Sequence, residues 1–379
     1  MRAPRVAKAQ PWAPISERFQ RKSSLSFEHS LGSDRCQYST GKLVAMAGID
    51  STRRLKYKTR ASTASEFVLR FRRPMKLIIA SLLLAASTLT VLQAGQDKRS
   101  NRADDYANRA APPVTAEAKS DMETRLAEAR TRFEADPNNP DAIIWLGRRL
   151  SYLGRFVEAI ETYTGGVEKF PRDARLYRHR GHRYLTLRKF DLAIADLKKA
   201  ANLVKGKPDE VEPDGQPNAR NIPTGTLQFN IWYHLGLAQY LTDRNKEALS
   251  SYRECLKVSK NPDSIVATTH WLYMTLRRLN RAKEAASVLD PIRPGMDIIE
   301  NDGYYRLALM YKGLVAADAL LAETLKQTGS SGSYSILYGI GNWYLYNGQR
   351  EKAVEIFRQM LAGNQWTSFG YIAAEAELK

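Results

Sequence analysis

The chain has 379 residues and a formal net charge of +18, from 58 lysines and arginines against 40 acidic residues. Residues 1–74 carry 16 basic and 5 acidic residues, whereas residues 97–379 carry 41 and 35. The charge balance of the second region is ordinary and gives no support to nucleic-acid binding. With only two cysteines, a disulfide framework and a cysteine-rich zinc module are excluded.

The first segment, residues 1–74, is rich in arginine and serine and has no sustained hydrophobic periodicity. This composition is typical of disorder, and a transit peptide has the same bias. We favour a third interpretation, in which this basic segment is a mis-called extension that precedes the natural start of the protein.

Residues 75–96 have the pattern of a secretory signal. Met75 is followed by Lys76, by an uncharged apolar stretch over residues 77–92 and then by the small residue Ala94. Such a segment predicts a cleaved signal peptide, or a signal anchor if it stays uncleaved. Either form would place the rest of the chain outside the cytoplasm, as a periplasmic or secreted protein, with membrane contact only through this segment.

Two short regions separate the signal from the main part of the chain. Residues 97–119 are polar and contain two adjacent prolines, so we expect a flexible linker. Residues 120–139 begin with Ser120 and Glu123 at capping-box spacing, followed by apolar positions on one helical face. They predict a flanking helix that stacks on the next element.

One spacing recurs four times after this helix: a small residue, another small residue twelve positions later, and a large residue four positions after that. The four series begin at Gly147, Gly181, Gly236 and Gly341. Small residues let two helices approach closely, and the large residue fills the space beside them. The spacing therefore predicts one helical hairpin for each unit.

The stretches IWLGRRLSYLGRFVEAIETY, WYHLGLAQYLTDRNKEALSSY and LYGIGNWYLYNGQREKAVEIF carry this pattern. They resemble the tetratricopeptide repeat (TPR) family. The resemblance implies an all-α TPR superhelical solenoid of about six helical hairpins with flanking capping helices over residues 120–379. We assign TPR 1–2 to residues 140–207 and TPR 3–6 to 229–367, around an inserted Pro/Gly-rich loop at 208–228. A C-terminal capping helix follows at 368–379, and repeats 4 and 5 depart from the pattern.

Signatures of catalysis are missing from the sequence, which has no phosphate-binding loop, dinucleotide-binding glycine motif, nucleophile elbow or HExxH motif. His179 and His182 share a helix face, but the arginines around them oppose a metal cation. Cys255 is expected to be a small buried residue and not a nucleophile. We therefore expect no enzyme activity, no metal and no cofactor.

The resemblance also implies a binding groove, because TPR proteins dock an extended peptide or a helix against the first helices of their hairpins. At the corresponding positions this chain has a groove that is basic toward its start and aromatic toward its end. Arginine pairs with carboxylates and tyrosine offers rigid contact area, so an acidic peptide is favoured, with solvated helix faces as the alternative. The candidate residues are Arg148, Tyr152, Arg175, Arg178, His182, Tyr233, Tyr240, His270, Arg277, Tyr338 and Asn342.

The sequence thus favours a non-catalytic scaffold or adaptor that binds a protein or peptide outside the cytoplasm. One alternative is an accessory subunit of an envelope or secreted enzyme, with chemistry in the 208–228 loop or in a partner chain. Another is an RNA-binding helical repeat that uses the arginines of repeat 2. Export and the modest charge of the folded region argue against the last, so we expect no nucleic acid.

Overall fold

The computed structural model describes residues 105–327 and 330–378. The basic segment 1–74 and the signal-like segment 75–96 lie outside the described residues. The described part of the chain is built from helices, and its only β-type pairing is an isolated bridge between Val211 and Thr226. None of these helices is both long enough and apolar enough to cross a membrane.

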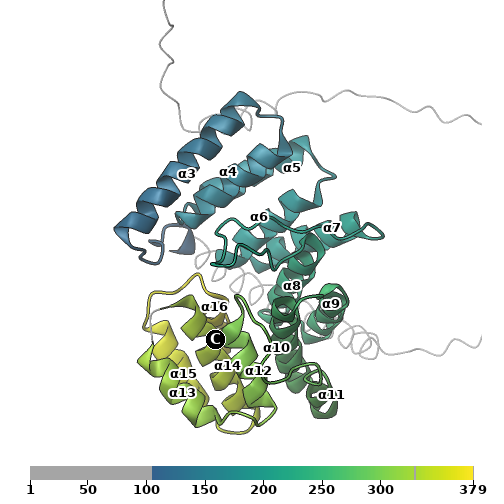
Figure 1. The fold of residues 1–379 in the computed structure, drawn as a ribbon, viewed down its shortest axis with the longest axis vertical. Coiled ribbons are helices and arrows are strands. Elements are labelled where there is room, and N and C mark those ends of the chain that lie inside the picture. The colour runs from purple at the N-terminus through teal and green to yellow at the C-terminus, as the bar shows by residue number, and fades with distance from the viewer. Residues whose placement is uncertain (1–104, 328–329, 379) are drawn as a thin grey trace, which may run out of the picture. The chain divides into compact units, whose positions relative to one another are not determined.

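Most helices follow one another as first and second members of hairpins (Figure 1). The pairs are α4 (Pro140–Tyr152) with α5 (Phe156–Lys169), α6 (Ala174–Thr186) with α7 (Phe190–Val204), α8 (Leu227–Tyr240) with α9 (Asn245–Val258), α10 (Pro262–Arg278) with α11 (Ala282–Ser287), α12 (Asp302–Tyr311) with α13 (Ala317–Lys326), and α14 (Ser331–Tyr346) with α15 (Arg350–Leu361). Helix α3 (Ala116–Ala135) packs on α4, and α16 (Phe369–Glu377) packs on α14 and α15. The predicted all-α solenoid is confirmed.

The two weak repeats differ from the others as their sequences suggest. Helix α11 has 6 residues and α13 has 10, against 12 to 15 for the other second helices. Helix α12 packs on α10 and α14, and α13 packs on α14. The array therefore departs from regular hairpin stacking at this point.

The close approach of paired helices explains the glycine spacing. A Cβ added at Gly147 would lie 2.4 Å from the ring of Tyr163, and one added at Gly341 would lie 2.5 Å from the ring of Phe357. Gly236 stands in the same relation to Tyr252, at 2.7 Å. The large residue of the sequence pattern therefore covers the glycine of the facing helix, as the spacing predicts.

A common turn joins the two helices of each hairpin. It contains one residue with positive φ: Gly154, Arg188, Asp243, Asn280, Gly313 or Gly348. The next residue donates its N–H to a carbonyl five positions earlier, as Arg155 does to Leu150 at 3.0 Å. Second helices consequently begin without a side-chain cap, whereas α4, α6, α8, α10 and α14 begin with a capping Asn, Asp, Thr or Ser side chain.

The segment before α3 differs from the expected flexible linker. The Tyr106 ring packs at a tilt against Trp366 with 5.5 Å between ring centroids, and the Trp366 indole donates to the carbonyl of Ala110 at 2.7 Å. Helix α3 begins at Ala116 with Thr115 as its cap, so Ser120 lies inside the helix and not at its start. The polar segment before α3 is held by contacts with Trp366, which is distant in sequence. No local sequence pattern therefore predicts its structure.

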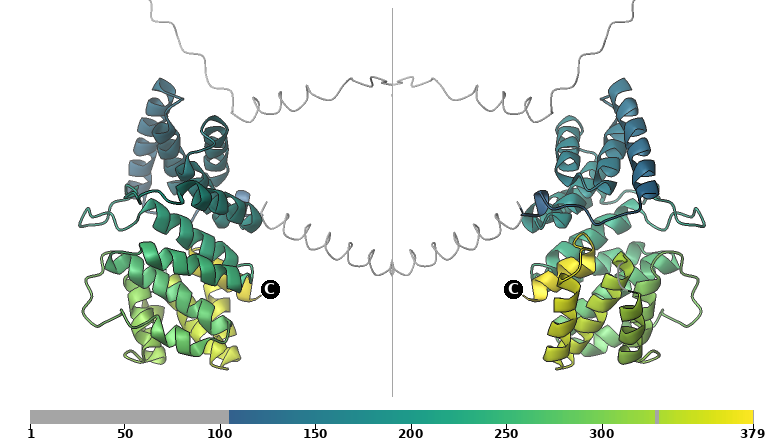
Figure 2. Two further views of the ribbon diagram at one scale, coloured as in Figure 1. Left: turned by 90° about the vertical axis from the view of Figure 1, so that its right-hand side faces the viewer. Right: turned by 90° about the vertical axis from the view of Figure 1, so that its left-hand side faces the viewer.

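The C-terminal helix does more than close the last repeat. The Phe369 ring of α16 lies 5.5 Å from His182 of α6 and 6.3 Å from Tyr233 of α8. Arg188, in the turn after α6, pairs with Glu375 at 2.8 Å. Both views in Figure 2 show the yellow C-terminal helices against the green middle repeats. The array thus folds back on the surface formed by its first helices, which we call the first-helix face.

Candidate functional site

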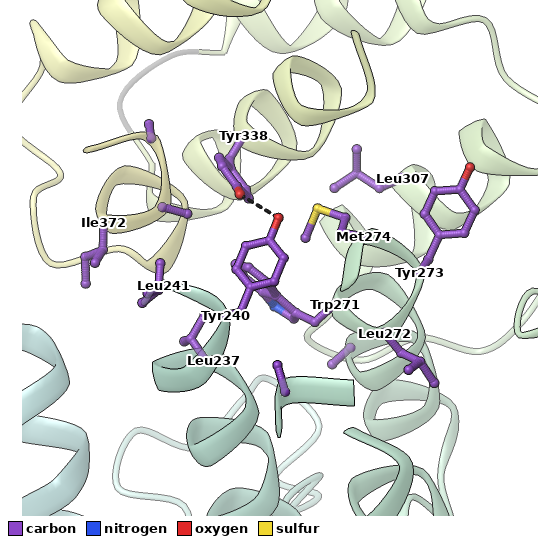
Figure 3. Packing of buried hydrophobic residues seen from close by; sticks show 14 of the residues in the cluster. Leu237, Tyr240, Leu241, Trp271, Leu272, Tyr273, Met274, Leu307, Tyr338 and Ile372 are labelled. Atoms are coloured by element: carbon purple, nitrogen blue, oxygen red, sulfur yellow. Dashed lines mark hydrogen bonds between the residues drawn. The ribbon is translucent and has the colours of Figure 1, made fainter. Parts of the chain in front are cut away.

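The aromatic half of the predicted groove lies in the interior. Tyr240, His270, Tyr338 and Asn342 are each at most 1% exposed. The hydroxyls of Tyr240 and Tyr338 are 2.9 Å apart (Figure 3), and the Asn342 amide donates to Tyr240 at 3.0 Å. His270 stacks on Tyr304 at 4.7 Å. The prediction that these residues face an open groove is wrong, because the fold-back of the C-terminal repeats covers them.

Tyr233 and His182 are covered in the same way. Tyr233 accepts a hydrogen bond from the Trp271 indole at 2.8 Å and is 5% exposed. His182 lies 4.3 Å from the His234 ring and also contacts Phe369 of α16. Burial and Arg183 lower the pKa of His182 well below its usual value, so this ring is neutral at neutral pH.

The basic half of the predicted groove is covered by the inserted loop. We call residues 209–215, at the start of this loop, the strap. Arg148 donates to the carbonyl of Pro213 at 2.8 Å, and Arg149 donates to that of Gly215 at 2.7 Å. Arg178 pairs with Glu212 at 2.9 Å, with both side chains nearly buried. Arg148 and Arg178 therefore bind a segment of their own chain.

Backbone pairing sets the position of the strap. Glu212 donates its N–H to Gly225 at 3.1 Å, and Glu210 accepts from the N–H of Leu227 at 2.8 Å. The far side of the loop is fixed by Arg220, which pairs with Asp297 at 2.7 Å. The loop therefore links the start of α8 to the segment before α12 while its strap lies on α4 and α6.

Glycine is required where the strap meets the first helices. Gly215 is buried, and a Cβ added to it would lie 1.7 Å from the Tyr152 hydroxyl. Tyr152, a predicted groove residue, also accepts a hydrogen bond from Arg148 at 3.4 Å. It thus serves as a contact for the strap.

Positive charge exceeds negative charge beneath the strap. Burial lowers the pKa of Arg183 to about 10, and repulsion from Arg178 and Arg148 adds to this effect. Burial and Arg178 lower the pKa of His179 well below its usual value, so its ring is neutral. Of the three arginines Arg148, Arg178 and Arg183, only Arg178 has an ion pair with a carboxylate, Glu212, in the described part of the chain.

Arg175, the remaining predicted residue of the basic half, is engaged at the edge of this region. It pairs with Asp141 and Asp173, each at 2.6 Å, and the hydrogen bond to Asp173 raises its pKa. A cavity of about 250 Å³ lies between the strap and the first helices. It is lined by Asp141, Ile144, Trp145, Arg148, Arg175, His179, Glu210, Val211, Glu212, Pro213 and Leu227.

An open polar cleft lies at the other end of the first-helix face, among the turns. Its volume is about 490 Å³, and we call it the turn cleft. Its lining residues are Asp243, Asn245, Arg277, Arg278, Asn280, Ala282, Asn342, Leu345 and Tyr346. Arg277 and Asn342 were the predicted residues among them, and the others were missed. Asp243 and Asn280 occupy the same position relative to the starts of their repeats. This shared position was the signal in the sequence, because stacked repeats place equivalent turns along one edge of the array.

Arg277 is held in the turn cleft by an aromatic ring. Its guanidinium lies 4.3 Å from the centroid of Tyr346 and donates to Asn347 at 3.0 Å. Arg278 beside it pairs with Asp243 at 3.6 Å and with Glu377 of α16. The buried Asn245 Oδ1 and Tyr346 Oη have no hydrogen-bond partner among the described residues. The cleft therefore offers oriented and unsatisfied polar groups to a ligand.

The sulfur and imidazole groups form no reactive site in the part of the chain that the structure describes. Cys255 is fully buried 3.2 Å from the Thr268 hydroxyl, and burial raises its thiol pKa to about 12. This confirms the prediction of a small buried residue. Among residues 105–327 and 330–378, no cluster of three side chains of the metal-ligating types occurs.

Sequence comparison identifies the repeats. Models of the tetratricopeptide repeat family match residues 229–262 and 336–368, which cover most of α8–α9 and of α14–α15. The chain contains tetratricopeptide repeats at these two places. It is 30% identical over 135 residues to human "Tetratricopeptide repeat protein 13", a match that covers 36% of this chain and 13% of the human protein.

Three solved structures match parts of the chain at low sequence identity. YrrB, described as having an unusual peptide-binding site, has 16% identity and a TM-score of 0.36, and the match covers 66% of this chain and 98% of YrrB. MamA has 19% identity and a TM-score of 0.36, with coverage of 52% and 92%. A TPR protein from Parabacteroides merdae ATCC 43184 has 13% identity and a TM-score of 0.40, with coverage of 75% and 98%.

Proposed function

We propose that this protein is a non-catalytic scaffold that binds a polar peptide segment of a partner protein in the turn cleft. TPR repeats indicate a protein–protein interaction scaffold, and the cleft supplies the specific site. The observation that carries the proposal is the pair of unsatisfied buried atoms, Asn245 Oδ1 and Tyr346 Oη, beside the oriented guanidinium of Arg277. An amide oxygen accepts from a peptide N–H, whereas a tyrosine hydroxyl and a guanidinium donate to peptide carbonyls and carboxylates.

The dimensions of the cleft fit such a ligand. Its volume of about 490 Å³ falls within the range of small-ligand sites, so it accommodates a few residues of a peptide. Stacking on Tyr346 keeps Arg277 in one orientation, which reduces the entropy lost on binding. A partner segment with a carboxylate or an exposed carbonyl is the ligand class that this surface favours.

The arginines that raised the RNA-binding alternative support the protein-binding proposal instead. Arg180 pairs with Asp196 at 2.7 Å, and Arg188 pairs with Glu375. Arg178 is occupied by Glu212. These side chains are committed to carboxylates, so they do not form the free basic surface that non-specific nucleic-acid binding uses.

The binding proposal is tested by capture of partners from the cells in which the protein occurs. Arg277→Glu should abolish capture of the partner that the unaltered protein retains, since it removes the oriented donor and adds a repelling carboxylate. Arg358→Glu, on the exposed face of α15, makes the same charge change away from the cleft and should leave capture intact. Equal capture by the two variants would contradict the proposal.

We also propose that the scaffold works outside the cytoplasm, on the strength of the signal pattern in residues 75–96. N-terminal sequencing of the fractionated native protein should find an extracytoplasmic chain that starts near residue 95 if the signal is cleaved, or at Met75 if it is retained. A cytoplasmic chain that retains any part of residues 1–74 would overturn this proposal.

A further inference from the structure

We propose that the strap is an internal ligand of the first-helix face, and that an extended acidic peptide of a partner binds there by displacing it. This inference builds on the proposed scaffold function and adds a second, gated peptide site at the basic end. It differs from the turn cleft in position and in residues.

The strap contacts the first helices in the way that a bound peptide would. Its main-chain carbonyls at Pro213 and Gly215 accept hydrogen bonds from two arginines, and its Glu212 side chain pairs with Arg178. Main-chain acceptance and one charged anchor are features of extended-peptide recognition. The sequence Glu-Pro-Asp-Gly at this position is itself that of a short acidic peptide.

The repeat array does not need the strap in order to stack. The spacing between Gly147 and Gly181 is 34 residues, whereas that between Gly181 and Gly236 is 55. The extra residues form the inserted loop, and α7 still packs directly on α8. Displacement of the strap would therefore leave the contacts between neighbouring hairpins in place.

The strap satisfies its site incompletely. The buried Nε of Arg178 has no hydrogen-bond partner among the described residues, and neither does the buried Oδ2 of Asp214. Arg148, Arg178 and Arg183 repel one another, and only Arg178 pairs with Glu212. A partner peptide with two carboxylates in reach of these arginines would compensate more charge than the strap does, which identifies the ligand as acidic.

The cavity of about 250 Å³ beside the strap gives such a peptide a point of entry. Trp145, Arg148 and Arg175 line it on the helix side, and Glu210 lines it on the strap side. An incoming carboxylate can therefore reach Arg148 before the strap has left. The cavity thus leaves the site partly open to a peptide, and the strap is a bound segment that the peptide can replace.

The test uses a variant that lifts the strap without altering any helix residue. Gly215→Ala places a methyl group 1.7 Å from the Tyr152 hydroxyl and 2.8 Å from Arg148 Nη2, so the contact of the strap with these two side chains must change. Gly165→Ala, on α5 where nothing lies within 4 Å of an added Cβ, is the matched control. Circular dichroism of each full-length variant verifies that the helices are retained.

The probe is a fluorescent peptide with the strap's own sequence, KPDEVEPDGQP, measured by fluorescence anisotropy in phosphate-free buffer. Gly215→Ala should bind it about tenfold or more tightly than the unaltered protein and Gly165→Ala do, since apparent affinity scales with the fraction of open molecules. The same peptide with Gln and Asn in place of Glu and Asp should not bind. Adding Arg149→Gln to Gly215→Ala should weaken binding, because it removes the donor to the peptide carbonyl.

Two outcomes would overturn the inference. One is a folded Gly215→Ala variant that binds the acidic peptide no better than the control does, and the other is an equal gain for the neutral peptide. Neither result concerns the turn cleft, which is tested by Arg277→Glu. Conversely, if Arg277→Glu leaves partner capture unchanged but Gly215→Ala still binds the peptide tightly, the gated site is retained and only the turn-cleft proposal is rejected.

Discussion

At the residue scale, each hairpin turn contains one residue with a positive φ angle. The amino acid at that position has a measurable effect on the free energy of unfolding. Gly348 has φ 83° with nothing within 4 Å of an added Cβ. Gly348→Ala should therefore lower the free energy of unfolding by about 1–2 kcal/mol through backbone strain alone. Gly165→Ala, inside a helix and equally unobstructed, should raise it by about 0.5–1 kcal/mol. Urea denaturation of both variants checks the sign, and a stabilised Gly348→Ala would contradict the turn geometry.

The sequence contained most of this residue-scale information. Gly154 and Gly348 both have positive φ in their turns, a conformation that glycine adopts readily. Arg188 was not predicted there, because a non-glycine residue in this conformation is rare. Its side chain pairs with Glu375, and a partner 187 positions away leaves no trace in a local pattern.

At the element scale, the first and second helices of the hairpins were predictable, but the role of the last helix was not. Each hairpin is specified by local spacing, and solenoid repeats normally contact only their neighbours. Helix α16 instead contacts α6 and α8 through Phe369. The predicted groove failed for this reason, since the positions on the first helices were right but the chain's own C-terminal segment and inserted loop cover them.

The fold-back makes a prediction about Trp366, which precedes α16. This side chain is 1% exposed and contacts Phe156 and Tyr106. Trp366→Ala should lower the free energy of unfolding by about 3–5 kcal/mol, the usual cost of truncating a buried aromatic residue. Hydrogen exchange should rise in the α5–α6 region as well as in α16, because the contact joins both. A rise confined to α15 and α16 would show that the helix is only a terminal cap.

Trp343→Ala is the control for this experiment. Trp343 lies on α14 and is partly exposed, so its truncation should cost less and leave exchange in α5–α6 unchanged. A similar change in α5–α6 for both variants would indicate general destabilisation and not the loss of a specific link.

At the scale of the whole molecule, closure of the array buries histidines as neutral rings. Burial lowers the pKa of His270 to about 3, and those of His179, His182 and His234 also lie well below 6.5. An unfolded histidine titrates near 6.5. Between pH 6.5 and pH 3 the unfolded chain therefore binds more protons than the folded chain, and the free energy of unfolding falls as the pH falls.

For one histidine this linkage amounts to about 1.4 kcal/mol per pH unit below its unfolded pKa. Replacing His270 by Gln should therefore shrink the difference in unfolding free energy between pH 7 and pH 5 by about 2 kcal/mol. Urea titrations of the two proteins at both pH values make the comparison independent of any constant cost of the substitution. A pH difference that stays the same would mean that His270 is open to protons in the folded state. The first-helix face would then be less closed around His270 than its contacts with α12 and α14 indicate.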